Sequence, residues 1–198
     1  MKRFALLCLS TMLALACCKS TADKPAPASA PTTDRIVVLA KHLPIAGQPD
    51  LDADPVVVRF KKFAVTKAHF DPKNLEGGTA TIELDLTSLE SGDTERDDDL
   101  KSAKFLDIAK LATITIDVAK VEKQGARYAA IATVSCHGVT KTYPITFAVT
   151  ATTDRSVTIE GAKAFSRLDF GVGVDPAKDP TERVDPALII EWTLTLQP

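Results

Sequence analysis

Hydrophobic and polar residues alternate along most of the chain from residue 34 onward. The last run is the clearest, because hydrophobic residues recur at every second position from Leu188 to Leu196. A period of two places such residues on one face of a β-strand. In another run, the phase of the alternation changes after Phe60. Together the alternating runs predict strands at 35–41, 56–70, 79–87, 112–122, 127–136, 139–150, 156–164 and 187–196.

The segment 91–104 departs from this alternation. Thr94 and Asp97 have the T-x-x-D spacing of a helix N-terminus, and the first turn is acidic. Lys101 and Lys104 follow where cations interact favourably with the helix dipole. The sequence therefore predicts one short helix that begins at Thr94.

Almost every predicted strand has one hydrophobic and one polar face, which argues against a parallel sheet covered on both faces. An antiparallel sandwich or barrel is expected instead. Long strands, short connections and a single helix favour a closed up-and-down barrel, although periodicity is compatible with both. An eight-stranded barrel has an interior that side chains can fill or that can hold one slender ligand.

The N-terminus has the features of an export signal. Lys2 and Arg3 precede an uncharged apolar run, residues 4–16, that is too short to span a bilayer. The run ends in ALACC, which resembles a bacterial lipobox, and the alanine before Cys17 favours Cys17 over Cys18 as the lipidated first mature residue. Acyl chains such as palmitate would then anchor the protein stably. An ordinary cleaved signal with incidental cysteines is the alternative.

Residues 18–33 are rich in Pro, Ala, Ser and Thr and have no hydrophobic period, so they predict an extended tether. The expected organisation is a lipoprotein signal and lipobox at 1–17, the tether at 18–33 and a barrel at 34–198. Such a protein would be lipid-anchored in the bacterial cell envelope, in the periplasm or at the outer membrane.

Composition narrows the function classes. The chain has 198 residues, of which 45% are hydrophobic, as expected for one domain with a sizeable core. Removal of Lys2 and Arg3 with the signal leaves 22 of the 24 basic residues against 26 acidic ones, a net charge of −4. An acidic chain with 6% aromatic residues argues against a nucleic-acid partner. Cys136 is the single cysteine after the lipobox, so no internal disulfide is expected.

Three separated motifs resemble the YceI-like family in their order and spacing. They are Leu89-Glu90, Asp93, Arg96-Asp97, Leu100, Phe105-Leu106-Asp107 and Thr113-Ile114-Thr115 in the centre, then His137 to Lys141, then Arg167 to Gly171. The resemblance covers about residues 34–197. It implies an all-β, eight-stranded antiparallel, lipocalin-like barrel with one short helix at one end. It also implies a lumen that binds the long chain of a polyisoprenoid such as a quinone.

The inward faces of the predicted strands give the candidate lumen residues. A sealed core is the alternative, but the small residues Ala130, Ala132 and Gly161 would leave room for a ligand. The candidates are Phe60, Ile82, Leu84, Leu86, Ile114, Ile116, Tyr128, Val134, Tyr143, Ile145, Phe147 and Trp192.

Polar candidates lie near the expected barrel mouth. His42 matches a family position and is a candidate ligand contact there. Arg167 and Asp169 are two apart, so on a strand they would point the same way. An Arg167–Asp169 pair could pin the loop before Gly171 or orient a ligand head group.

No enzyme or metal site is predicted. Cys136 and His137 would face opposite sides of a strand, so Cys136 is expected to be a small buried hydrophobic residue. The acidic segment from Asp50 resembles a calcium loop, but Pro55 and Lys61 occupy its sixth and twelfth positions instead of Gly and Glu.

The expected function is binding an isoprenoid or a similar quinone-like amphiphile for carriage, storage or shielding. The alternative is a structural or stress-response lipoprotein with a filled barrel that acts through protein partners, and dimerisation is left open.

Overall fold

The computed structural model of the chain describes residues 34–44 and 54–198. The predicted signal at 1–17, the tether at 18–33 and most of the acidic segment after Asp50 lie outside these residues, as do Cys17 and Cys18. Within the described part, no helix has both the length and the apolar character needed to cross a membrane.

Within residues 34–44 and 54–198, ten strands form one antiparallel sheet in the order β3-β4-β6-β7-β8-β9-β10-β1-β2-β5. Their bounds are β1 (Arg35–Ala40), β2 (Val56–Phe60), β3 (Phe63–Asp71), β4 (Asn74–Asp85), β5 (Leu89–Glu90), β6 (Thr113–Gln124), β7 (Arg127–Cys136), β8 (Val139–Thr152), β9 (Val157–Ser166) and β10 (Ala187–Leu196). Two 3₁₀ turns, η1 (Leu86–Ser88) and η2 (Arg167–Phe170), and one helix, α1 (Thr94–Lys101), complete the described elements.

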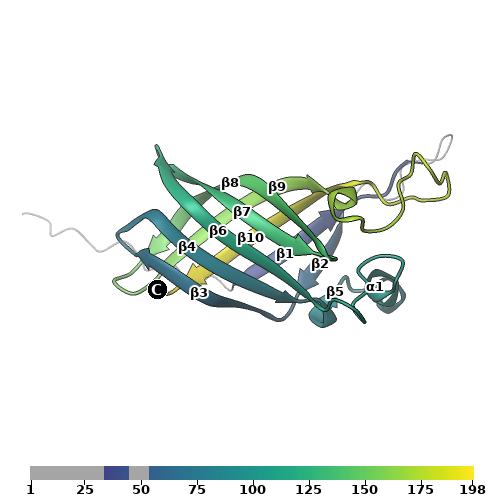
Figure 1. The fold of residues 1–198 in the computed structure, drawn as a ribbon, viewed down its shortest axis with the longest axis horizontal. Helices are drawn as coiled ribbons and strands as arrows, with labels where there is room; N and C mark the ends of the chain where they lie inside the picture. Colours follow the sequence, from purple (N-terminus) through teal and green to yellow (C-terminus); the bar gives the residue numbers. More distant parts are fainter. Residues whose placement is uncertain (1–33, 45–53) are drawn as a thin grey trace, which may run out of the picture.

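The strand pairings run around a ring. β2 and β3 are two parts of one segment, separated only by Lys61 and Lys62. β2 pairs with β1 and β5, β3 pairs with β4, and β1 pairs with β10. With β2 and β3 counted as one bent strand, and the two-residue β5 set apart, the ring has the eight strands that the sequence predicts. Figure 1 shows the curled sheet from the side.

The bend between β2 and β3 explains the change of phase after Phe60. Phe60 is buried, Lys61 and Lys62 are both exposed, and Phe63 packs against the core again. Two consecutive outward residues, in place of one, shift the alternation by one position, as in a β-bulge. The lysines therefore sit where the strand turns from β1 toward β4.

The two ends of the barrel differ. The hairpin turns β3–β4, β6–β7 and β8–β9 lie at the end that carries the C-terminus, whereas α1 and the segment 171–186 lie at the opposite end (Figure 1). We call this second end the mouth.

The helix begins where the sequence predicts it, but its N-cap is one residue earlier. Asp93 is the cap, because its carboxylate accepts a hydrogen bond from the backbone N–H of Arg96 at 3.1 Å. Asp97 instead accepts hydrogen bonds from the backbone N–H and the hydroxyl of Ser91, both at 2.7 Å. The predicted T-x-x-D cap at Thr94 is therefore wrong, and Asp97 holds the chain that enters the helix.

The core of the described part of the chain consists of two clusters. The larger one fills much of the barrel, and its most completely buried side chains are Leu84, Leu86 and Val157. The smaller one contains Phe105, Cys136, Phe170 and Val172. Between them the barrel holds a cavity.

Candidate ligand-binding site

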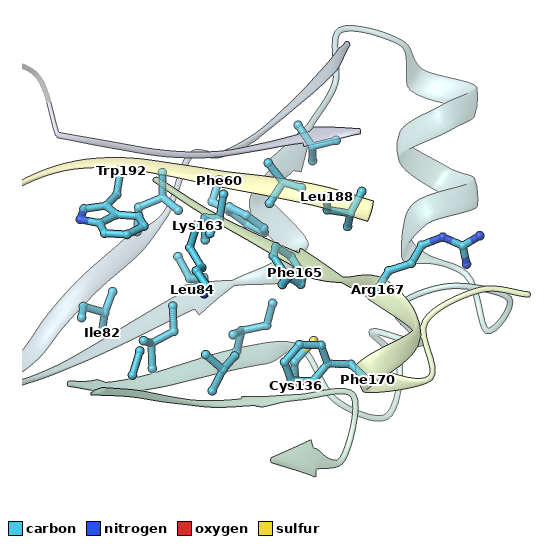
Figure 2. A pocket seen from close by; sticks show the side chains of 18 of the residues that line it. Phe60, Ile82, Leu84, Cys136, Lys163, Phe165, Arg167, Phe170, Leu188 and Trp192 are labelled. Atoms are coloured by element: carbon cyan, nitrogen blue, oxygen red, sulfur yellow. The ribbon is translucent and has the colours of Figure 1, made fainter. Parts of the chain in front are cut away.

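A cavity of about 240 Å³ lies inside the barrel. Side chains from β1, β2, β4, β5, β6, β7, β8, β9 and β10 line it, and residues of α1, of η2 and of the segments that follow α1 and η2 complete the wall. Among the described residues, Lys163 and Arg167 are the two charged members of a lining that is otherwise almost wholly apolar. Figure 2 shows part of this wall. The volume is just below the roughly 300–1,000 Å³ of small-molecule pockets, so the cavity suits a slender chain.

Most of the candidate lumen residues line this cavity. Leu86 does not, because it lies in η1 and is 1% exposed within the larger core cluster. Tyr128 also lies outside the cavity lining. Its ring stacks on that of Phe147, with the ring centroids 5.6 Å apart. The candidates that line the cavity are Phe60, Ile82, Leu84, Ile114, Ile116, Val134, Tyr143, Ile145, Phe147 and Trp192. Their contact with a ligand stays a prediction.

The small residues create space in different ways. Ala132 lines the cavity directly, and Ala130 is buried beside it on β7. Gly161 makes room for a protein side chain, because a Cβ atom at this position would overlap the ring of Trp192. The expected role of Gly161 in leaving space for a ligand is therefore wrong, since the indole occupies that space.

Arg167 holds the segment 171–186 in place through hydrogen bonds. Its side chain is buried at the mouth, with the residue only 2% exposed. The guanidinium donates to the carbonyl oxygens of Val172, Val174 and Val184, each at 2.8 Å, and more weakly to that of Asp185 at 3.4 Å. Because these carbonyls occupy most of its donors, Arg167 holds the loop against the barrel.

Asp169 belongs to a different contact. The predicted Arg167–Asp169 pair is wrong because these residues lie in η2, where three residues complete a turn and positions two apart diverge. Asp169 instead accepts a hydrogen bond from the hydroxyl of Tyr143 at 3.0 Å. Burial is the larger cause and this hydrogen bond the next of a rise in the pKa of Tyr143 to about 12.

His42 also supports the loop and is not part of the cavity lining. It forms an isolated antiparallel bridge with Val184. On either side of it, the N–H of Leu43 donates to the carbonyl of Arg183 at 2.7 Å, and the N–H of Asp185 donates to the carbonyl of Lys41 at 2.9 Å. The backbone around His42 therefore pairs with the segment 171–186, and a ligand contact at His42 stays a prediction.

Cys136 is a buried hydrophobic residue, as predicted. It lines the cavity within the smaller core cluster, and burial raises the pKa of its thiol to about 11. His137 lies in the β7–β8 turn, where its Nδ1 is 3.2 Å from the carbonyl oxygen of Phe170. Among the described residues, no group of three or more His, Cys, Asp or Glu side chains could hold a metal ion.

A family model for the YceI-like domain matches residues 34–196. The chain belongs to the YceI-like family. A UPF0312 protein of Vibrio campbellii is 36% identical over 78 residues, which are 39% of this chain and 40% of that protein. A UPF0312 protein of Yersinia pestis is 32% identical over 77 residues, 39% of each chain. The chain spans less than half the length of the curated relatives it matches.

Solved structures of the same fold include BcnA of Burkholderia cenocepacia, with a TM-score of 0.70 and 22% identity over 83% of this chain and 96% of that one. A YceI protein of Campylobacter jejuni has a TM-score of 0.64 and 16% identity over 91% of this chain and 98% of that one. A polyisoprenoid-binding domain from Saccharophagus degradans has a TM-score of 0.61 and 12% identity over 83% of this chain and 94% of that one.

The YceI-like barrel also has cavity residues that the sequence analysis missed. Leu100, Phe105 and Leu106 come from α1 and the segment after it, outside any alternating run. Their position shows that the helical end covers the cavity at the mouth. No period in the sequence indicates which of these side chains turn inward.

Lys163 is the most informative of the missed residues. It follows Ile159 and Gly161 on the inward face of β9, so its place in the alternation gives the signal. The predicted lumen residues were all hydrophobic or aromatic, so a lysine at an inward position was not among them.

Proposed function

We propose that this YceI-like protein binds a polyisoprenoid or a similar single-chain amphiphile in the barrel lumen and acts by binding, without catalysis. The observation that carries the proposal is the apolar cavity of about 240 Å³ inside the barrel. Evolution of a binding site accounts for such a cavity, whereas an empty apolar space weakens a core that serves only as a scaffold.

The hydrophobic effect is the main source of free energy for such binding. Each buried CH₂ group contributes about 0.8 kcal/mol, so about ten of them give roughly 8 kcal/mol. Association loses translational and rotational freedom that costs about 4–15 kcal/mol. A ligand therefore needs a long apolar chain to bind tightly here, which favours isoprenoid tails and long acyl chains over small polar molecules.

Family membership supports the same ligand class. The Saccharophagus degradans domain with this fold is described as polyisoprenoid-binding. We extend that class of ligand to the present chain because its lumen is apolar and narrow.

We further propose that the protein is a lipoprotein of the bacterial cell envelope, anchored through Cys17. The apolar run at 4–16, the ALACC sequence and the Pro-rich segment 18–33 support this location. A tethered barrel near a membrane surface could receive an amphiphile from the bilayer and carry, store or shield it. The alternative of a structural lipoprotein with a filled barrel is less consistent with the cavity.

A cavity-filling variant tests the proposal. Ala132→Phe places a ring in the lumen, whereas Ala162→Phe adds the same ring at an exposed position of β9. Residues 19–198 contain the complete strand ring, so this form can be titrated with farnesol and geranylgeraniol. Loss of binding in Ala132→Phe but not in Ala162→Phe is expected. Equal binding by both variants, with both folded by circular dichroism, would contradict a lumen site.

A further inference from the structure

Lys163 is a charged residue in the wall of the lumen. Its side chain extends from β9 into the cavity, on the same wall as Trp192 and Phe165 (Figure 2). Lys163 is half-buried, in contrast to the exposed Ala162 and Ala164 that flank it.

The strand register fixes this inward position. Lys163 pairs with Ile190 and Gly161 pairs with Trp192 on β10, and all four residues except the glycine line the cavity. Residues on one face of a strand cannot move to the other face without a slip of register. A slip here would bring the exposed Ala162 and Ala164 inward, so the lysine is held inside by the whole β9–β10 pairing.

Within residues 34–44 and 54–198, Lys163 has no acidic partner. None of the ion pairs Lys61–Glu90, Lys73–Asp154, Arg96–Asp93 and Lys110–Asp107 involves the cavity. The lining contains no Asp or Glu, and within the described chain Lys163 forms no hydrogen bond or ion pair. A charged group that faces an apolar wall is unfavourable unless something compensates it.

The other polar groups of the lining are engaged by the protein. The guanidinium of Arg167 donates to backbone carbonyls, and the hydroxyl of Tyr143 donates to Asp169. Among the described residues, Lys163 is therefore the charged side chain of the lining that no protein group engages.

We propose that Lys163 binds the acidic head group of an amphiphile, a carboxylate or a phosphate, while the chain of the same molecule occupies the apolar cavity. This inference rests on the proposed function and narrows it to anionic ligands. An ammonium offers three donors, and its hydrogen bonds to charged oxygens are among the stronger ones in proteins. An amphiphile with a neutral alcohol or quinone head group would bind with lower affinity, because it lacks the charged oxygens.

The position of Lys163 also sets the depth of the head group. On β9, Lys163 lies four residues from Arg167 at the mouth and six from the fully buried Val157, about 13 Å and 20 Å along a strand. The cavity lining extends from Lys163 both toward the mouth, to Phe170 and Leu188, and away from it, to Ile159 and Leu194. A head group at Lys163 therefore lies within the barrel and has apolar wall on both sides. This differs from the expectation of a ligand contact at His42 and a head group oriented by Arg167 and Asp169 at the mouth.

Pairs of probes that share one hydrocarbon chain but differ in head-group charge distinguish the contribution of the charge from that of the chain. Trp192 is the single tryptophan of the chain and lies in the cavity wall, so its fluorescence reports on binding. Residues 19–198 are titrated with hexadecanoate and hexadecanol, and with farnesyl phosphate and farnesol. The first pair tests a fatty acid as the source of the acidic group, and the second tests a prenyl phosphate.

Lys163→Met is expected to weaken binding of at least one acidic probe about tenfold or more and to leave its neutral partner nearly unchanged. Lys163→Arg should keep the preference for the acid, and Lys67→Met, at an exposed position of β3, should bind like the wild type. Equal binding of acidic and neutral probes by the wild type and Lys163→Met would overturn the role of Lys163 but leave lumen binding intact. Failure of every probe to bind the wild type would overturn both proposals.

Discussion

The indole ring of Trp192 lies over the backbone of Gly161, its pairing partner on the neighbouring strand β9. The glycine is required by this contact, because a Cβ atom would overlap the ring and would also approach the carbonyl oxygen of Thr146 to 2.9 Å. The pair therefore fixes how far the indole extends into the cavity.

Gly161→Ala should destabilise the protein by about 1–3 kcal/mol, because the added methyl group overpacks the β9–β10 contact. The indole should move toward the cavity and change its fluorescence spectrum. Urea denaturation followed by fluorescence measures both effects. Ala162→Val, on the exposed face of β9, is the matched control, and an equal loss of stability in both variants would contradict this account.

Arg167→Met should loosen the segment 171–186. The substitution leaves buried carbonyls without donors, each at about 1–3 kcal/mol. Lys should not restore the wild-type behaviour, because an ammonium lacks the planar fork that reaches several carbonyls at once. Hydrogen exchange and limited proteolysis of this segment measure the effect. Loss of ligand binding in a variant with an unchanged segment would instead indicate a head-group role for Arg167.

Cys136 should react slowly with thiol reagents below its raised pKa. With a pKa of about 11, the thiol at pH 8 is ionised in about one molecule in 1,000. Because the thiolate is the reactive form, the rate should rise about tenfold per pH unit up to about pH 11. In residues 19–198 this is the single cysteine, so labelling is unambiguous.

A bound amphiphile should slow this labelling further, since Cys136 lines the cavity. Protein unfolded in urea serves as the control and should react at the rate of an ordinary cysteine. If the folded protein were labelled at pH 8 as fast as the unfolded protein, Cys136 would be accessible to the reagent. That result would contradict the burial of Cys136 in the cavity wall.

Lipidation should depend on Cys17. Metabolic labelling with palmitate in a bacterial host should be lost in Cys17→Ser and retained in Cys18→Ser, because the residue before Cys17 is the small Ala16. The opposite pattern would assign the modification to Cys18. Absence of label from the wild type would instead support an ordinary cleaved signal.

The sequence predicted the strands well because each has one face toward the core and one toward solvent, which produces a period of two. Even the bend after Phe60 was visible as a change of phase. The prediction failed where the chain leaves the strand conformation. Leu86 follows Asp85, whose carboxylate accepts a hydrogen bond from the N–H of Thr87 at 2.9 Å and starts a 3₁₀ turn. A local polar contact of this kind does not appear in the hydrophobic pattern.

The site was predictable in part for the same reason. The aliphatic and aromatic wall follows from strand parity, whereas the contacts of Arg167 and Asp169 depend on η2 and on Gly171, which ends it in the left-handed conformation with φ of 65°. Lys163 shows a different failure, because its parity was correct but its polarity excluded it from a list of core residues. A charged residue at an inward position is a signal of function.

The central claim is that the lumen binds an amphiphile, and native mass spectrometry tests it most directly. The domain, residues 34–198, would be purified from a bacterial host without detergent, measured intact, and then extracted with solvent. We expect an added mass that the solvent removes and that corresponds to a single-chain amphiphile such as a prenyl lipid or a fatty acid. A bare polypeptide mass that stays unchanged after incubation with prenyl lipids and fatty acids would contradict the claim.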